Sequence, residues 1–176
     1  NPRPKHQNIR NTQSMTTPDR TSNMTGNMKR KMRSASRLYA VQALFQMEHS
    51  SLTLDKVRLE FLDIRFGELL NGEEMLEGDE GHFTRVLEDA VSHQAAIDQM
   101  TDRALVAKWP IARIDPTLRA LFRAAGAELK NDATPPKVVI AEYLDLASAF
   151  FPDGKEARFV NAVLDHMARE ARPDAF

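Results

Sequence analysis

The sequence predicts an all-α fold, and three observations support that class. Apolar residues recur three and four positions apart through most of the chain, which is helical spacing. Pro and Gly residues separate these segments, and no stretch shows the alternating pattern of a half-buried strand. With 176 residues, 42% of them hydrophobic, the chain has the size of one domain or two small ones.

The first half of the chain predicts three helices. The first covers residues 33–48, with Leu38, Val41 and Phe45 on its buried face. The second covers residues 54–64, is closed by Asn71-Gly72, and is followed by an acidic loop. The third runs from residue 83 to about 106, and Trp109-Pro110 ends it because the residue before proline disfavours helix.

In the second half of the chain, Asp, Pro and Gly residues mark the helix boundaries more clearly. Asp115 is expected to cap a helix that begins at Pro116, since aspartate at this position accepts a backbone hydrogen bond. Pro135-Pro136 opens the next helix, and the turn at residues 152–154 separates it from a last helix over residues 155–169.

Charge is distributed unevenly. Residues 1–32 hold seven Lys and Arg residues and one Asp, which gives +6 and leaves −7 for the other 144 residues of a chain with net charge −1. This segment has too few apolar residues to form a core, so we expect a disordered basic leader. A basic arm on an acidic body is typical of nucleic-acid contact, although an incidental polar extension has the same composition.

Several functional classes find no support. The chain has no Cys, so it has neither a disulfide framework nor a thiolate metal site, which suits a reducing cytoplasm. No Gly-rich loop follows a strand, and the five His residues are not spaced as metal ligands. Glu142 and Asp145 share a helix face, which we interpret as solvated. No apolar run is long enough to span a membrane. We therefore expect no catalysis, no cofactor and no metal.

Two helix starts are candidates for an anion-binding surface. Arg33 and Arg37 stand in the opening turns of the first helix, where cations oppose the helix dipole unless an anion such as phosphate is bound. In the last helix Phe159 lies about 100° off the apolar stripe, near Lys155 and Arg158. Aromatic stacking beside cations is a common way to bind single-stranded RNA. The alternatives are a solvated basic tail and a phenylalanine packed on a neighbouring helix.

Four segments together carry a family resemblance. RLYAVQALFQ, RALFRAAGAEL, PPKVVIAEYLDLASAF and KEARFVNAVLD resemble the NusB family of bacterial transcription antitermination factors, over roughly residues 33–170. The resemblance implies two small helical bundles, about residues 33–108 and 109–170, with a tail at 171–176. It also implies a non-enzymatic role, in which the protein and the ribosomal protein NusE bind boxA RNA of ribosomal-RNA transcripts and act on elongating RNA polymerase with other Nus factors.

The resemblance also implies which residues contact RNA. Carried over residue by residue, these are Arg33, Arg37, Arg158 and Phe159, with Gln42 as a weaker candidate. Lys155 joins them on the charge argument above. The family's arginine run is thinned here by Ser34-Ala35-Ser36, so we expect few phosphate contacts and a dependence on NusE.

Two other functions fit part of these observations. Ribosomal-RNA cytosine methyltransferases carry a NusB-like RNA-binding region, of which this chain would be a detached form. A helical protein–protein module with an incidental basic leader is the other. The family includes both monomers and homodimers, so a homodimer is compatible with the sequence.

Overall fold

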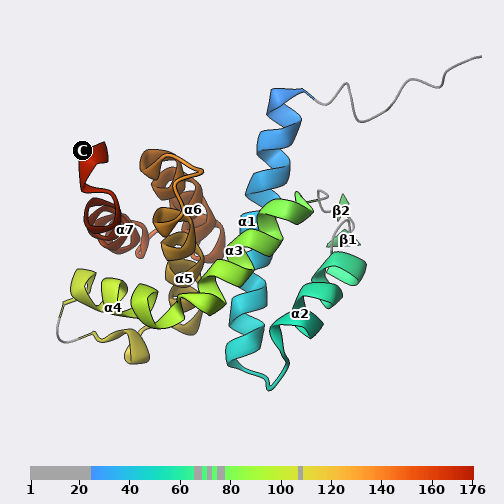
Figure 1. Ribbon diagram of the computed structural model, residues 1–176, viewed down its shortest axis with the longest axis horizontal. Helices are drawn as coiled ribbons and strands as arrows, with labels where there is room; N and C mark the ends of the chain where they lie inside the picture. Colours follow the sequence, from blue (N-terminus) through green and yellow to red (C-terminus); the bar gives the residue numbers. More distant parts are fainter. Residues whose placement is uncertain (1–24, 66–68, 71–72, 75–77, 107–108) are drawn as a thin grey trace, which may run out of the picture.

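The computed structural model describes residues 25–65, 69–70, 73–74, 78–106 and 109–176. Within these ranges the fold is all-α, as predicted (Figure 1). The helices are α1 (Gly26–Glu48), α2 (Leu54–Glu60), α3 (Glu80–Ser92), α4 (Gln94–Ala104), α5 (Pro116–Lys130), α6 (Pro136–Phe150) and α7 (Ala157–Ala171). A π-helical turn at Phe61–Arg65 continues α2, and short 3₁₀ turns lie at Ile111–Arg113 and Pro173–Ala175.

Helix α5 lies at the centre of the molecule and packs against α1, α3, α4, α6 and α7. Its small and apolar residues allow this, since Leu121, Phe122 and Ala124 are fully buried. Asp115 caps the helix as predicted, accepting a 2.7 Å hydrogen bond from the Thr117 amide. The division into two bundles stays a prediction, because α5 contacts helices assigned to both.

A glycine sets the approach of α5 to α4. A methyl group placed on Gly126 would collide with the side chain of Ile97, which is itself fully buried. The RALFRAAGAEL segment therefore needs a residue without a side chain at this crossing, and no other residue type fits there unless α4 shifts.

Helix α1 begins earlier than the sequence predicts. Its first residue is Gly26, and Thr25 caps it by accepting a 3.2 Å hydrogen bond from the Met28 amide. The end of the expected disordered leader is therefore wrong, since residues 26–32 are helical, whereas residues 1–24 lie outside the described ranges. Residues 25–31 are all exposed, because this part of the helix extends beyond the core (Figure 1).

The predicted third helix is two helices. Helix α3 ends at Ser92 and α4 begins at Gln94, with His93 between them outside helical geometry. A two-residue antiparallel pairing joins β1 (Leu69–Leu70) to β2 (Glu73–Glu74) at the start of the acidic loop, and it is too short to leave an alternating pattern in the sequence. The predicted turn at Asn71-Gly72 lies outside the described residues.

The last helices follow the prediction closely. Pro135 and Pro136 open α6, and Gly154 occupies the turn before α7 with φ of +73°, a conformation that favours glycine. Helix α7 buries Val160, Val163 and Met167, as its periodicity indicates. No helix in the described ranges has both the length and the apolarity needed to cross a membrane.

Candidate nucleic-acid interface

Several cationic side chains hold the fold together and are not available to a ligand. Arg119 and Arg123 of α5 both pair with Glu48 at the end of α1, and Arg123 also binds Asp98 of α4 at 2.9 Å. Arg172 donates to backbone carbonyls around the end of α5, including that of Leu129 at 2.8 Å. The arginines of the RALFR segment are therefore structural.

A second set of cations has no such partners. Among the described residues, Lys29, Arg30, Lys31, Arg33 and Arg85 make no ion pair. Four of them lie on the opening turns of α1, where no acidic residue balances the first turn, and Arg85 lies on α3. This is the uncompensated positive surface that an anion would bind.

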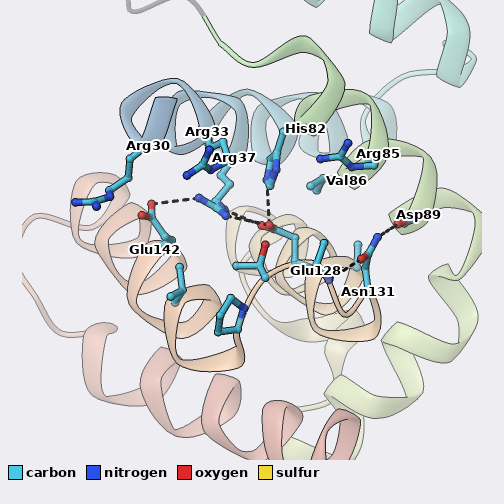
Figure 2. Close-up of a pocket in the computed structure, with 15 residues that line it drawn as sticks. Arg30, Arg33, Arg37, His82, Arg85, Val86, Asp89, Glu128, Asn131 and Glu142 are labelled. Carbon is cyan, nitrogen blue, oxygen red and sulfur yellow. Dashed lines mark hydrogen bonds and ion pairs between the residues drawn. The ribbon is translucent and has the colours of Figure 1, made fainter. Parts of the chain in front are cut away.

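Three of these arginines line a cavity of about 440 Å³. Figure 2 shows Arg30, Arg33 and Arg85 along one rim, with Glu142 and Asn131 along the opposite one. Helices α1 and α3 supply the arginines, whereas the end of α5, the following turn and the start of α6 supply the other wall. Residues distant in the sequence thus form one concave, partly basic surface.

A buried polar network forms the floor of the cavity. Glu128, only 4% exposed, accepts hydrogen bonds from Arg37 Nε at 2.8 Å and Nη2 at 3.1 Å, and from the Tyr143 hydroxyl at 2.5 Å. The Nε2 atom of His82 lies 3.0 Å from the second carboxylate oxygen (Figure 2). Four helices, α1, α3, α5 and α6, therefore meet at one carboxylate.

The network shifts the pKa values of its members. Burial alone would raise the pKa of Glu128, but the imidazole of His82 and the hydrogen bonds and charge of Arg37 outweigh it and lower the pKa to about 2. Burial likewise opposes the charge of Arg37, yet Glu128 raises the pKa of that guanidinium above its ordinary value. Burial and the Glu128 charge raise the pKa of Tyr143. The ion pair stays charged and the phenol neutral at pH 7.

Arg37 is therefore placed differently from the sequence prediction. Its side chain is 3% exposed, with the guanidinium bound to Glu128 and 3.6 Å from Glu142, so no surface remains for an RNA phosphate. The reason is tertiary, because the partner carboxylates come from α5 and α6. Arg33, one turn earlier, is half-buried at the cavity and keeps its charge unpaired.

The two serines between these arginines have structural roles. Ser36 is fully buried and donates to the carbonyl of Asp79 at 2.7 Å, which joins α1 to the start of α3. Ser34 donates to Glu142 at 2.7 Å. Glu142 therefore binds two residues of α1, and the interpretation of its helix face as merely solvated was wrong.

Gln42 lies farther along α1, at a second cavity of about 450 Å³ whose walls include Phe45, Phe61 and Phe150. Phe150 ends α6, and the turn that follows leads directly to α7. Gln42 is thus near the end of α6 that carries this turn, whereas Arg33 lies by the beginning of α6, at Pro135 and Val138.

The remaining predicted residues surround the start of α7. Lys155 and Arg158 are exposed, and Lys155 precedes the helix, which begins at Ala157. Phe159 is half-buried and meets the ring of Phe122 edge-on, with 6.2 Å between centroids. The packing interpretation of Phe159 therefore holds in part, because one portion of the ring packs on α5, and base stacking by the exposed portion stays a prediction.

Sequence reasoning did not single out His82, Arg85 or Glu128. The periodicity of α3 places Arg85 outside its apolar stripe, which was the only available signal for it. For Glu128 the sequence carries no such signal, because its role depends on residues 91 positions earlier and 15 positions later in the chain. Across the described residues no cluster of His, Asp and Glu is arranged to hold a metal ion.

Comparison with known proteins supports a single assignment. The NusB family model matches residues 34–169. Transcription antitermination protein NusB of Granulibacter bethesdensis is 43% identical over 156 residues, covering 85% of this chain and 95% of that protein. The NusB of Maricaulis maris is 44% identical over 148 residues, covering 83% of this chain and 91% of its own.

Solved structures agree with this comparison. T. maritima NusB superimposes with a TM-score of 0.65 at 26% identity, covering 85% of this chain and 96% of its own. Antitermination factor NusB in a complex with NusE and double-stranded RNA gives the same TM-score at 21% identity, covering 81% of this chain and 97% of its own. At that identity the likeness supports the fold alone. The match of the family model, the identity and the coverage show that the chain belongs to the NusB family.

Proposed function

We propose that this protein is a transcription antitermination factor that binds boxA RNA of ribosomal-RNA transcripts together with NusE. Relatives more than 40% identical over most of their length are antitermination proteins, which supports this role over a methyltransferase fragment or a generic protein–protein module. The role is non-enzymatic and cytoplasmic, and the protein acts on elongating RNA polymerase with other Nus factors.

One structural observation carries the RNA part of the proposal. The exposed opening turns of α1 extend beyond the core and present Lys29, Arg30 and Lys31, followed by the half-buried Arg33, and none of the four makes an ion pair within the described residues. Unpaired cations on a projecting helix cost stability through mutual repulsion and are compensated when phosphates bind between them. The basic residues just before Arg33 thus offset the thinned arginine run.

The RNA path extends from this arm towards the start of α7. Gln42 lies between the two ends, and Lys155 and Arg158 provide exposed positive charge beyond it. The solvent-facing part of Phe159 supplies a stacking surface for a base. Arg37 is not a contact in this proposal. It holds α1 against α5 and α6 and so orients the arm.

The test is a salt titration of boxA RNA binding with the Lys29→Ala/Arg30→Ala/Lys31→Ala variant. Each phosphate contact on a single strand contributes about −0.7 to the log–log slope, so losing two or three contacts flattens it by roughly 1.5–2. Arg113→Ala, which removes an exposed cation outside the arm, is the control and keeps the wild-type slope. A variant slope equal to the wild type would reject the arm as the RNA site.

A second measurement tests the partner. NusE is titrated into the protein by calorimetry with and without boxA RNA, and with a scrambled RNA of equal length. We expect boxA RNA to tighten NusE binding and NusE to tighten RNA binding by the same factor, since coupling is reciprocal. Independent binding of the two ligands would contradict the joint role, and equal binding of both RNAs would contradict boxA specificity.

A further inference from the structure

The cavity beneath α1 has an excess of unpaired cations that structural roles do not explain. Its carboxylates are all engaged: Glu128 by Arg37, Glu142 by Ser34, and Asp89 by the side-chain amide of Asn131 at 3.3 Å. The rim arginines Arg30, Arg33 and Arg85 have no ion-pair partner among the described residues (Figure 2). They come from two helices, α1 and α3, and line one cavity.

The size and walls of the cavity indicate more than a single phosphate. A volume of about 440 Å³ lies in the range of small-molecule sites. Val86 and Val138 provide apolar surface on opposite walls, and Val138 is 43% exposed although it is hydrophobic. Arginine guanidinium planes stack on nucleobases as well as binding phosphate.

We propose that this cavity binds one nucleotide, with its phosphate between Arg33 and Arg85 and its base between the walls formed by Val86 and Val138. The inference rests on the proposed RNA-binding function and extends it, because it adds a pocket for a single unstacked nucleotide to an arm that contacts only the backbone. The same chemistry would accept a nucleotide of an RNA strand or a free nucleoside monophosphate.

An acidic peptide fits this cavity less well. Its side chains would bring several carboxylates close to Asp89 and Glu142, which line the same cavity, whereas a nucleotide brings one phosphate and a neutral base. The side-chain amide of Asn131, at the cavity wall, donates one N–H to Asp89 and accepts from the Ala133 amide, which leaves its second N–H as a donor for a base edge.

The test uses two variants of the full chain. Arg85→Ala removes the cation on α3, and Val138→Trp fills the cavity without changing charge. The matched controls are Arg113→Ala, an exposed arginine outside the cavity, and Leu59→Trp, which introduces the same large side chain at a 51% exposed position on α2. All four sites are exposed, so thermal melts should match the wild type. RNA affinity is measured by fluorescence, and binding of AMP, CMP, GMP and UMP is measured from the NMR shift of the Asn131 side-chain amide.

If a strand nucleotide occupies the cavity, Arg85→Ala weakens boxA RNA binding about tenfold, the loss expected for one hydrogen bond to a charged group. Val138→Trp also weakens it, because the indole occupies the space of the base, and both controls bind normally. If a free nucleotide occupies it, a mononucleotide shifts Asn131 in the wild type but not in the variants. Inorganic phosphate alone, giving the same shift, would overturn the base subsite. The proposal would be overturned if the variants lost NusE binding measured in the absence of RNA. It would also be overturned if neither variant changed the binding of RNA or of a mononucleotide. If the wild type binds no RNA at all, the proposed function fails, and the mononucleotide titration still decides the inference.

Discussion

Arg37 on α1 and Glu128 on α5 form an ion pair whose side chains are 3% and 5% exposed, with 2.8 Å between Nε and Oε2. The pair joins the base of the projecting arm to the central helix. Its hydrogen bonds extend to Tyr143 on α6, and His82 on α3 lies against the same carboxylate. One carboxylate thus fixes the relative positions of the helices that surround the cavity.

We expect Arg37→Ala to destabilise the protein by about 3–5 kcal/mol, because it leaves the buried charge of Glu128 without its main partner. Urea unfolding measures the loss. Arg33→Ala, one turn away and unpaired, should change the free energy of unfolding by less than about 0.5 kcal/mol while weakening RNA binding. The opposite pattern, with a stable Arg37→Ala variant that binds RNA poorly, would return Arg37 to the RNA interface.

The stability of the protein should fall in acid because of Glu128. The pKa of its carboxyl is lowered from 4.5 to about 2 in the folded state, so its contribution is complete above pH 4.5 and disappears as the pH falls towards 2. A shift of this size corresponds to roughly 3 kcal/mol. Urea unfolding of the wild type between pH 6 and pH 2 measures the decline.

The Glu128→Gln variant should lose that component of the pH dependence, because it has no carboxyl to protonate at this site. Glu88→Gln, which removes an exposed carboxyl on α3, controls for the change in net charge. If Glu128→Gln follows the same pH curve as the wild type, some other group is responsible for the acid sensitivity.

Two glycine substitutions should have opposite effects. Gly126→Ala should cost roughly 1–3 kcal/mol, because the new methyl group collides with the buried side chain of Ile97. Gly81→Ala lies on the exposed side of α3, where the methyl would meet Asp79 Oδ1 at an ordinary 3.5 Å, and the gain in helix propensity should stabilise by about 0.5–1 kcal/mol. Thermal melts of both variants check the signs, and a neutral Gly126→Ala would mean that α4 and α5 are more loosely packed than described.

Phe159→Ala should affect both stability and RNA affinity. Because Phe159 is half-buried against Phe122, its removal should cost less than the roughly 3–5 kcal/mol expected for the fully buried Phe122→Ala. Loss of base stacking should reduce RNA affinity by about 1–3 kcal/mol, and Phe159→Tyr should retain it. Stability and affinity are measured on the same preparations, and unchanged affinity would assign Phe159 to the core alone.

Most of the fold could be predicted from the sequence, because its signals are local. The cap at Asp115, the prolines that open α6 and the glycine turn before α7 each depend on a few neighbouring residues, and all are found in place. The misplaced boundaries have local causes that periodicity does not detect. Thr25 and Asp79 cap helices that begin before their apolar stripes, and His93 interrupts a stripe that is otherwise continuous.

The candidate site could be predicted only in part. Cations that make no ion pair, such as the half-buried Arg33 and the exposed Arg158, need no partner, so their position on a helix face is enough to identify them. Arg37 lies on the same helix and has similar neighbours in the sequence, but its side chain is buried in ion pairs. Its partners Glu128 and Glu142 come from helices about a hundred residues away. Tertiary pairing of this kind has no periodicity, and it separates the contact residues from the structural ones.

The carbonyl contacts of Arg172 have a consequence for the order in which the protein matures. A nascent chain that has completed α6 already contains every residue lining the cavity, yet the turn at Asn131–Thr134 is still without the guanidinium that binds the carbonyls of Asn131 and Thr134. That guanidinium follows α7. The ribosome must therefore synthesise α1 to α7 before one wall of the cavity is fixed, and the surface to which α1 contributes is completed by a residue that follows α7.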